Sequence, residues 1–257
     1  MNRLLVFAFL FFIGSLTGWI LELFFRRFFS KNNPDKKWIN PGFLVGPWLP
    51  IYGFGLWGMY FVSRKIAVHI ELNQAADIAV VFVLMAVTMT VIEYLAGLIF
   101  IKGLKVKLWD YSGENLNIQG IICPKFTFFW GLLGCFYYLV INPYVIGWVE
   151  WLSYHLTFSF FIGTAFGIFI IDFSYSMQIV ASMKRFAEEK EIIIKYEEFK
   201  DHIRMQREKL EERKRFIMAF KSEAPFRDLL ESYLEDMIED NADRINQVRE
   251  NIIHKIS

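Results

Sequence analysis

Long apolar stretches alternate with short polar connections over residues 1–182. The apolar windows fall near residues 4–25, 48–63, 76–101, 126–147 and 156–181. A helix rises about 1.5 Å per residue, so roughly 20 apolar residues cross the hydrocarbon core of a bilayer, which is about 30 Å thick. The pattern therefore predicts an all-α integral membrane protein built as a five-span helical bundle, and it excludes a soluble enzyme.

Beyond the last window the sequence becomes charged. A stripe at alternating spacings of four and three runs from Ile192 to Phe220 and again from Leu234 to Ile252, and this spacing is typical of helices that pack on a partner. The stripe is apolar except at Gln206, Arg213 and Asn241. Residues 222–225 interrupt the rhythm with a serine and a proline that suit a helix start. Residues 183–257 are therefore predicted to form a cytoplasmic helical hairpin. A coiled-coil docking surface for a cytoplasmic partner and a self-contained stalk or dimer zipper fit this spacing equally well.

Charge predicts the orientation of the chain in the membrane. The 257 residues contain 28 Lys+Arg and 27 Asp+Glu, and without a basic arm they do not favour nucleic acid as a partner. The four connections hold five (Arg26, Arg27, Lys31, Lys36, Lys37), two (Arg64, Lys65), four (Lys102, Lys105, Lys107, Lys125) and no basic residues. Because cytoplasmic loops retain excess Lys and Arg, we expect a cell-membrane protein with its N-terminus outside and its C-terminus in the cytoplasm.

The connection before the second window mixes helix-breaking and apolar residues. Its breakers are Pro41, Pro47 and Pro50 with Gly42, Gly46, Gly53 and Gly55. Regular helix cannot form through 40–50, and irregular backbone at membrane depth survives only where protein or water satisfies its polar groups. Residues 43–45 are too apolar for a solvated loop. The segment is therefore predicted to be broken and re-entrant or cavity-lining, in preference to a tight cytoplasmic loop.

Three acids interrupt the apolar windows: Glu22, Glu93 and Asp172. A carboxylate in the bilayer centre costs on the order of 2.5–3.5 kcal/mol on insertion scales, so it is expected to face a cavity or a cation. Arg26 lies one turn after Glu22 and offers an ordinary salt bridge. Asp172 precedes polar residues and fits the exit of the fifth span. Glu93 has no basic residue within a turn and is the strongest functional candidate.

The third connection carries a cluster of polar and aromatic residues. Trp109, Asp110 and Tyr111 are followed by Ser112 and Asn117. Turn chemistry, in which side chains cap backbone groups, accounts for residues 112–117. It leaves Asp110, between two aromatic residues, least explained.

Glycines at four-residue spacing occur twice, at Gly14 with Gly18 and at Gly163 with Gly167. Missing side chains let membrane helices approach closely. Packing within one bundle is the favoured interpretation, and a dimer interface is the alternative.

The irregular segment, the inner acids and the third connection are predicted to meet in one polar pocket in the cytoplasmic half of the bundle. The predicted pocket residues are Glu22, Asn40, Pro41, Gly42, Gly46, Pro47, Pro50, Tyr52, Glu93, Trp109, Asp110, Tyr111 and Asn117. No catalytic residue, metal ligand or cofactor is assigned, because the two cysteines and four histidines form no recognisable pairing.

Together these motifs resemble a known bacterial family. The runs Gly18–Glu22, Asn40–Pro47, Leu49–Gly55, Glu93–Gly97, Trp109–Ser112 and Trp130–Gly134 are similar, in order and spacing, to the putative ABC-transporter type IV, or CmpB-like permease, family. The resemblance covers roughly residues 14–145 and implies a transporter permease. The charged tail lies outside it.

Three functions follow from these observations. The first is a transport subunit, powered by a separate ATPase because the chain contains no G-x-x-x-x-G-K-[ST] phosphate loop, and completed by that partner or by a second copy. The second is a membrane-embedded enzyme that acts on a lipid-like substrate. The third is a membrane anchor for a cytoplasmic partner. The transport subunit is preferred, and an enzyme is less favoured.

Overall fold

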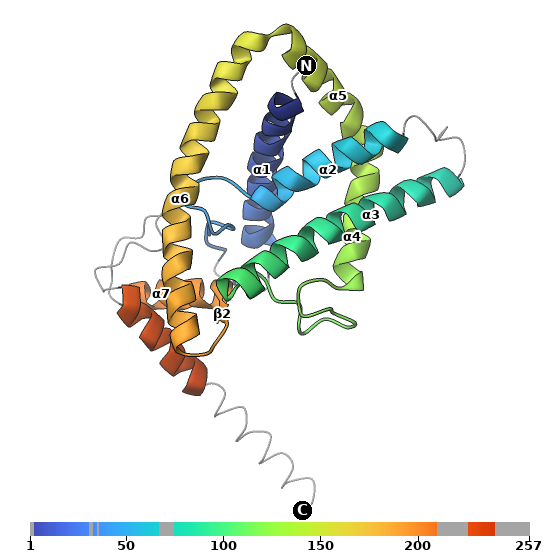
Figure 1. Cartoon of the computed structure of the whole chain (residues 1–257). Coiled ribbons are helices and arrows are strands. Elements are labelled where there is room, and N and C mark those ends of the chain that lie inside the picture. The colour runs from blue at the N-terminus through green and yellow to red at the C-terminus, as the bar shows by residue number, and fades with distance from the viewer. Residues whose placement is uncertain (1–2, 31–32, 35, 67–74, 210–225, 240–257) are drawn as a thin grey trace, which may run out of the picture.

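The computed structural model describes residues 3–30, 33–34, 36–66, 75–209 and 226–239, and these residues are almost entirely helical (Figure 1). The elements are α1 (Arg3–Phe28), α2 (Pro50–Ile66), α3 (Ala75–Leu98), η1 (Ile99–Gly103), β1 (Val106–Lys107), α4 (Pro124–Phe136), η2 (Tyr137–Ile141), α5 (Asn142–Tyr154), η3 (Leu156–Phe158), α6 (Ser159–Glu189), β2 (Ile194–Lys195) and α7 (Tyr196–Lys209). Residues 226–239 form a further helix.

Four helical stretches among the described residues are long and apolar enough to cross a membrane. They are Arg3–Phe28, Asp77–Gly103, Pro124–Tyr154 and Leu156–Glu189. The all-α membrane architecture predicted from the sequence therefore holds. At 17 residues α2 is shorter than these four stretches, so the count of five spans stays a prediction.

The fourth span differs from its expected length. The predicted window ended near residue 147, whereas α4, η2 and α5 continue as one bent helical stretch to Tyr154, and only a short turn precedes α6 (Figure 1). Pro143 does not end the helix because it stands in the first turn of α5, directly after the π-helical turn η2, where a missing N–H is tolerated.

The membrane part has an apolar core between α1, α2, α3 and the α4–α5 stretch, to which α6 contributes Ile162. Its fully buried members include Leu10, Met85, Met89, Tyr137 and Leu152. Gly14 and Gly18 pack directly on α2, where an added Cβ at Gly18 would lie 2.2 Å from the ring of Tyr52. This glycine pair therefore serves packing within the bundle.

The second glycine pair lies in different surroundings. An added Cβ at Gly163 or Gly167 would meet nothing within 4 Å among the described residues. Of the span window in Leu156–Glu189 only 6% is buried, against 28–39% for the other three, and Figure 1 shows α6 along the side of the bundle. The expected close packing within the bundle is thus absent at this pair.

A second core lies beyond the membrane part. Val180, Met183 and Phe186 of α6 pack with Phe199 and Ile203 of α7 and with Leu230 and Tyr233 of the 226–239 helix. The boundary predicted after residue 182 lies inside α6, which continues without a break to Glu189. The predicted turn at residues 222–225 is outside the described residues.

Of the predicted stripe in the last described helix, Leu234 packs against the second core. Leu229, Leu230 and Tyr233 are buried, whereas Ile238 of the predicted stripe is 60% exposed. A short parallel pair, β1 with β2, adds a contact that the sequence pattern did not predict, with Val106 opposite Ile194. This pair joins the third connection to the start of the tail.

Candidate functional site

Glu93 lies inside the bundle and is hydrogen-bonded through both carboxylate oxygens. It is 2% exposed, on the α3 face that packs against α4. Tyr111 donates its hydroxyl to Oε1 at 3.0 Å, and Trp130 of α4 donates its indole N–H to Oε2 at 3.0 Å. These two donors compensate for the loss of water that burial of the acid requires.

Glu22 reaches the same region from α1. Tyr52 of α2 donates its hydroxyl to Glu22 at 3.3 Å, and its ring packs edge-on against Trp130, with ring centroids 5.9 Å apart. Arg26 pairs with Glu22 at 3.1 Å, as the four-residue spacing predicted. Side chains from α1, α2, α3, α4 and the third connection therefore form one series of contacts between Arg26 and Tyr111.

Asn40 organises the irregular segment before α2. Its side-chain oxygen accepts the indole N–H of Trp19 at 2.8 Å, and its amide nitrogen donates to the backbone oxygens of Leu44 and Val45 at 2.9 and 3.2 Å. These bonds satisfy backbone groups that no helix or strand pairs. Pro41 and Gly42 are buried, Pro47 is exposed, and α2 begins at Pro50.

Asp172 of α6 binds the middle of the irregular segment that precedes α2. Its two oxygens accept the backbone N–H groups of Val45 and Gly46, each at 3.0 Å. An added Cβ at Gly46 would lie 2.9 Å from this carboxylate, so only glycine allows the approach. The sequence reasoning ranked Asp172 lowest of the three acids and omitted it from the pocket, although its carboxylate binds the backbone of the segment to α6.

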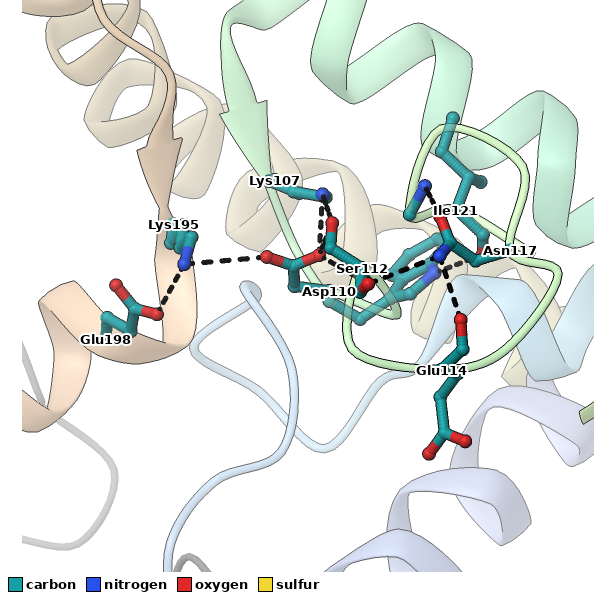
Figure 2. Close-up of polar contacts among 10 residues, drawn as sticks. Lys107, Asp110, Ser112, Glu114, Asn117, Ile121, Lys195 and Glu198 are labelled. Carbon is teal, nitrogen blue, oxygen red and sulfur yellow. Dashed lines mark hydrogen bonds and ion pairs between the residues drawn. The ribbon is translucent and has the colours of Figure 1, made fainter. Parts of the chain in front are cut away.

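Asp110 belongs to a separate cluster beside the β1–β2 pair (Figure 2). Lys107 of β1 contacts Oδ1 at 2.6 Å, Lys195 of β2 contacts Oδ2 at 3.5 Å, and Ser112 donates its backbone N–H at 2.9 Å. Burial raises the pKa of Asp110, but Lys107 and Ser112 outweigh this effect and hold the pKa well below its ordinary value. Asp110 therefore acts as an ionised link between two connections, and among the described residues no hydrogen bond or ion pair joins it to Glu93.

The rest of the third connection follows turn chemistry, as predicted for residues 112–117. Asn117 donates to the backbone oxygens of Ser112 and Glu114 and accepts the N–H of Gly120 at 2.9 Å (Figure 2). Trp109 donates its indole N–H to the backbone oxygen of Ile121 at 2.9 Å. These bonds fix the loop that carries Tyr111 to Glu93.

The tail contributes charges that the sequence reasoning did not include. Glu197 of α7 pairs with Arg26 at 2.5 Å and with Lys200 at 3.3 Å. Lys200 is 5% exposed and donates to the backbone oxygen of Asn40 at 2.8 Å. The tail is thus bound to both α1 and the irregular segment. Only the three-dimensional fold could reveal the contacts with Arg26 and Asn40, because each joins residues that lie more than 150 positions apart in the sequence.

Apolar membrane-crossing helices with a buried polar network between them define a multi-pass helical membrane protein. A family model described as "Putative ABC-transporter type IV" matches residues 9–177, and the chain belongs to this family. The resemblance inferred from the sequence motifs is confirmed, and family membership assigns the chain to membrane transport components. No curated protein and no solved structure matches the chain. The match ends within α6, so α7 lies beyond it.

Proposed function

We propose that the chain is the membrane-spanning subunit of a transporter, and that the polar network around Glu93 lines its path in the cytoplasmic half of the bundle. The observation that carries the proposal is the buried carboxylate of Glu93, held by Tyr111 and Trp130 from two different elements. Ionisable groups inside membrane helices are costly and commonly mark substrate or ion pathways.

The irregular segment would form the wall of this path as a re-entrant stretch. Asn40 contacts Trp19, and the backbone N–H of Leu49 donates to the oxygen of Ser15 at 3.1 Å. Trp19 and Ser15 precede the end of α1 by 9 and 13 residues, which corresponds to about 13 and about 20 Å of helix rise. A segment that follows α1 to this height supports the re-entrant interpretation, because irregular backbone at that depth requires protein partners such as Asp172.

A separate ATPase would supply the energy. The chain has no phosphate-binding loop of its own, and the ABC-transporter description of the family supports such a partner. The basic connections support a cytoplasmic location for the tail, where an ATPase could reach α7.

Cysteine labelling in inside-out membrane vesicles, compared with intact cells, tests the path. In a chain with Cys123 and Cys135 replaced by alanine, Phe43→Cys should react with a membrane-impermeant maleimide delivered from the cytoplasmic side. Leu95→Cys is the matched control, since Leu95 lies two residues after Glu93 and is 54% exposed on the outer face of α3. It should stay unreactive because lipid suppresses thiolate formation. Equal reactivity of the two, or reaction of Phe43→Cys from outside only, would contradict the path.

Affinity purification of the full chain in mild detergent tests the energy source. We expect an ATP-hydrolysing protein with its own phosphate loop to co-purify, and its recovery to fall when Glu197 and Lys200 are both replaced. A preparation that transports nothing and retains no ATPase would favour the membrane-anchor alternative.

A further inference from the structure

Two consecutive arginines at the end of α1 have different surroundings. Arg26 makes ion pairs with Glu22 and Glu197. The guanidinium carbon of Arg27 instead lies 4.2 Å from the ring centroid of Trp38. Nε of Arg27 is covered by protein and has no hydrogen-bond partner among the described residues. An acceptor from outside the chain cannot reach this covered nitrogen, but Arg27 as a whole is only half-buried, so such an acceptor can bind the Nη groups of the guanidinium.

The stacking of Trp38 on Arg27 is built into the loop. Asn33 is 5% exposed, and its amide nitrogen donates to the backbone oxygens of Arg26 and Lys37 at 3.0 and 2.8 Å. Its side-chain oxygen accepts the backbone N–H of Lys37 at 3.1 Å. These three bonds return the chain to the end of α1 and place Trp38 beside it, so the arrangement is pre-organised.

The surroundings of this pair combine aromatic and basic groups. Trp38 packs edge-on against Phe24 and Phe28, with ring centroids 5.5 and 6.3 Å apart, and all three are exposed. Lys36 is also exposed. Exposed aromatic rings with cations at the end of a membrane helix are typical of the headgroup region of a bilayer.

We propose that Arg27 and Trp38 form a binding site for an anionic phospholipid. The planar guanidinium matches the geometry of a phosphate diester, and stacking on the indole holds it in one orientation. Phe24 and Phe28 offer apolar surface to the acyl chains. Lys36 adds a second positive charge for an anionic headgroup. Free phosphate would use the cations but not the phenylalanines, so we assign the site to the lipid.

Quenching of Trp38 fluorescence by brominated lipids tests the site. The full chain is reconstituted into vesicles of phosphatidylglycerol and phosphatidylcholine in equal amounts, with bromine on the acyl chains of one lipid or the other. The signal of Trp38 is the difference between the chain and its Trp38→Phe variant. Because a basic residue near a lipid surface favours anionic lipid about fivefold, we expect phosphatidylglycerol to quench Trp38 about fivefold more strongly than phosphatidylcholine.

Three variants separate a built site from general charge attraction. Arg27→Gln should abolish the preference, whereas Arg64→Gln, at the exposed end of α2, should leave it unchanged. Arg27→Lys keeps the charge without the planar fork and should reduce the preference. Equal quenching by the two lipids in the native chain, or an unchanged preference in Arg27→Gln or Arg27→Lys, would overturn the proposal.

Discussion

Replacing Glu197 by glutamine should weaken the attachment of the tail more than replacing Lys200 by methionine. Glu197 lies between Arg26 and Lys200, and its replacement by a neutral residue would take away the ion-pair partner of Lys200, whose side chain is 6% exposed. An unpaired buried charge costs 3–5 kcal/mol, which we reduce to about 2 kcal/mol because Glu197 is one-third exposed. Lys200→Met removes the buried charge itself and keeps its apolar stem, so it should cost about 1 kcal/mol or less.

The double variant gives the sharpest test of this reasoning. Glu197→Gln with Lys200→Met should be more stable than Glu197→Gln alone, because the unpaired cation is gone. The free energy for opening of α7 can be measured by amide hydrogen exchange in detergent micelles. A double variant that is less stable than Glu197→Gln, or a Glu197→Gln cost below about 0.5 kcal/mol, would refute the view that this ion pair network holds the tail.

Three further predictions concern packing, the buried acid and pH. Gly18→Ala would place a Cβ 2.2 Å from the ring of Tyr52 and should destabilise the bundle by about 1–3 kcal/mol, whereas Gly163→Ala, with nothing within 4 Å, should change the thermal midpoint little. Glu93→Gln keeps one oxygen to accept the indole N–H of Trp130, and its amide can donate to the hydroxyl oxygen of Tyr111, whose own proton then loses its acceptor, so this variant should cost about 1 kcal/mol. Glu93→Leu leaves both donors without an acceptor and should cost about 2–5 kcal/mol. Burial raises the pKa of Glu197, but the two cations beside it outweigh burial and lower that pKa below its ordinary value. The stabilisation from this carboxylate is therefore present above about pH 4.5 and lost as the pH falls through the lowered pKa, so α7 amides should exchange faster in acid, and this dependence should disappear in Glu197→Gln.

The sequence predicted the features that depend on local pattern and not those that depend on tertiary partners. Hydropathy predicted the membrane helices, and a four-residue spacing predicted the pair between Glu22 and Arg26. Trp130, the partner of Glu93, lies 37 residues away, and no spacing rule connects them. That these residues form one pocket stays a prediction.

Asp172 shows why the sequence did not predict contacts that depend on tertiary structure. It precedes polar residues, so its position resembles the end of a span, and only the fold brings it to Val45 and Gly46. The boundary predicted after residue 182 rests on a related signal. Hydropathy falls near residue 182, but the helix continues because Met183 and Phe186 pack into the second core. Charged helices that pack along one face carry no signal on a hydropathy scale.

Because α6 is uninterrupted, it couples the position of the irregular segment to the position of the second core. Asp172, which holds the irregular segment, and Met183, in the core shared with the tail, stand 11 residues apart on one rod, or about 16 Å. If the helix tilts by about 10° around Met183, the carboxylate moves by about 3 Å, which is as long as each hydrogen bond that it accepts. A small rotation of the tail would therefore break both hydrogen bonds that Asp172 accepts from Val45 and Gly46, without unfolding any helix.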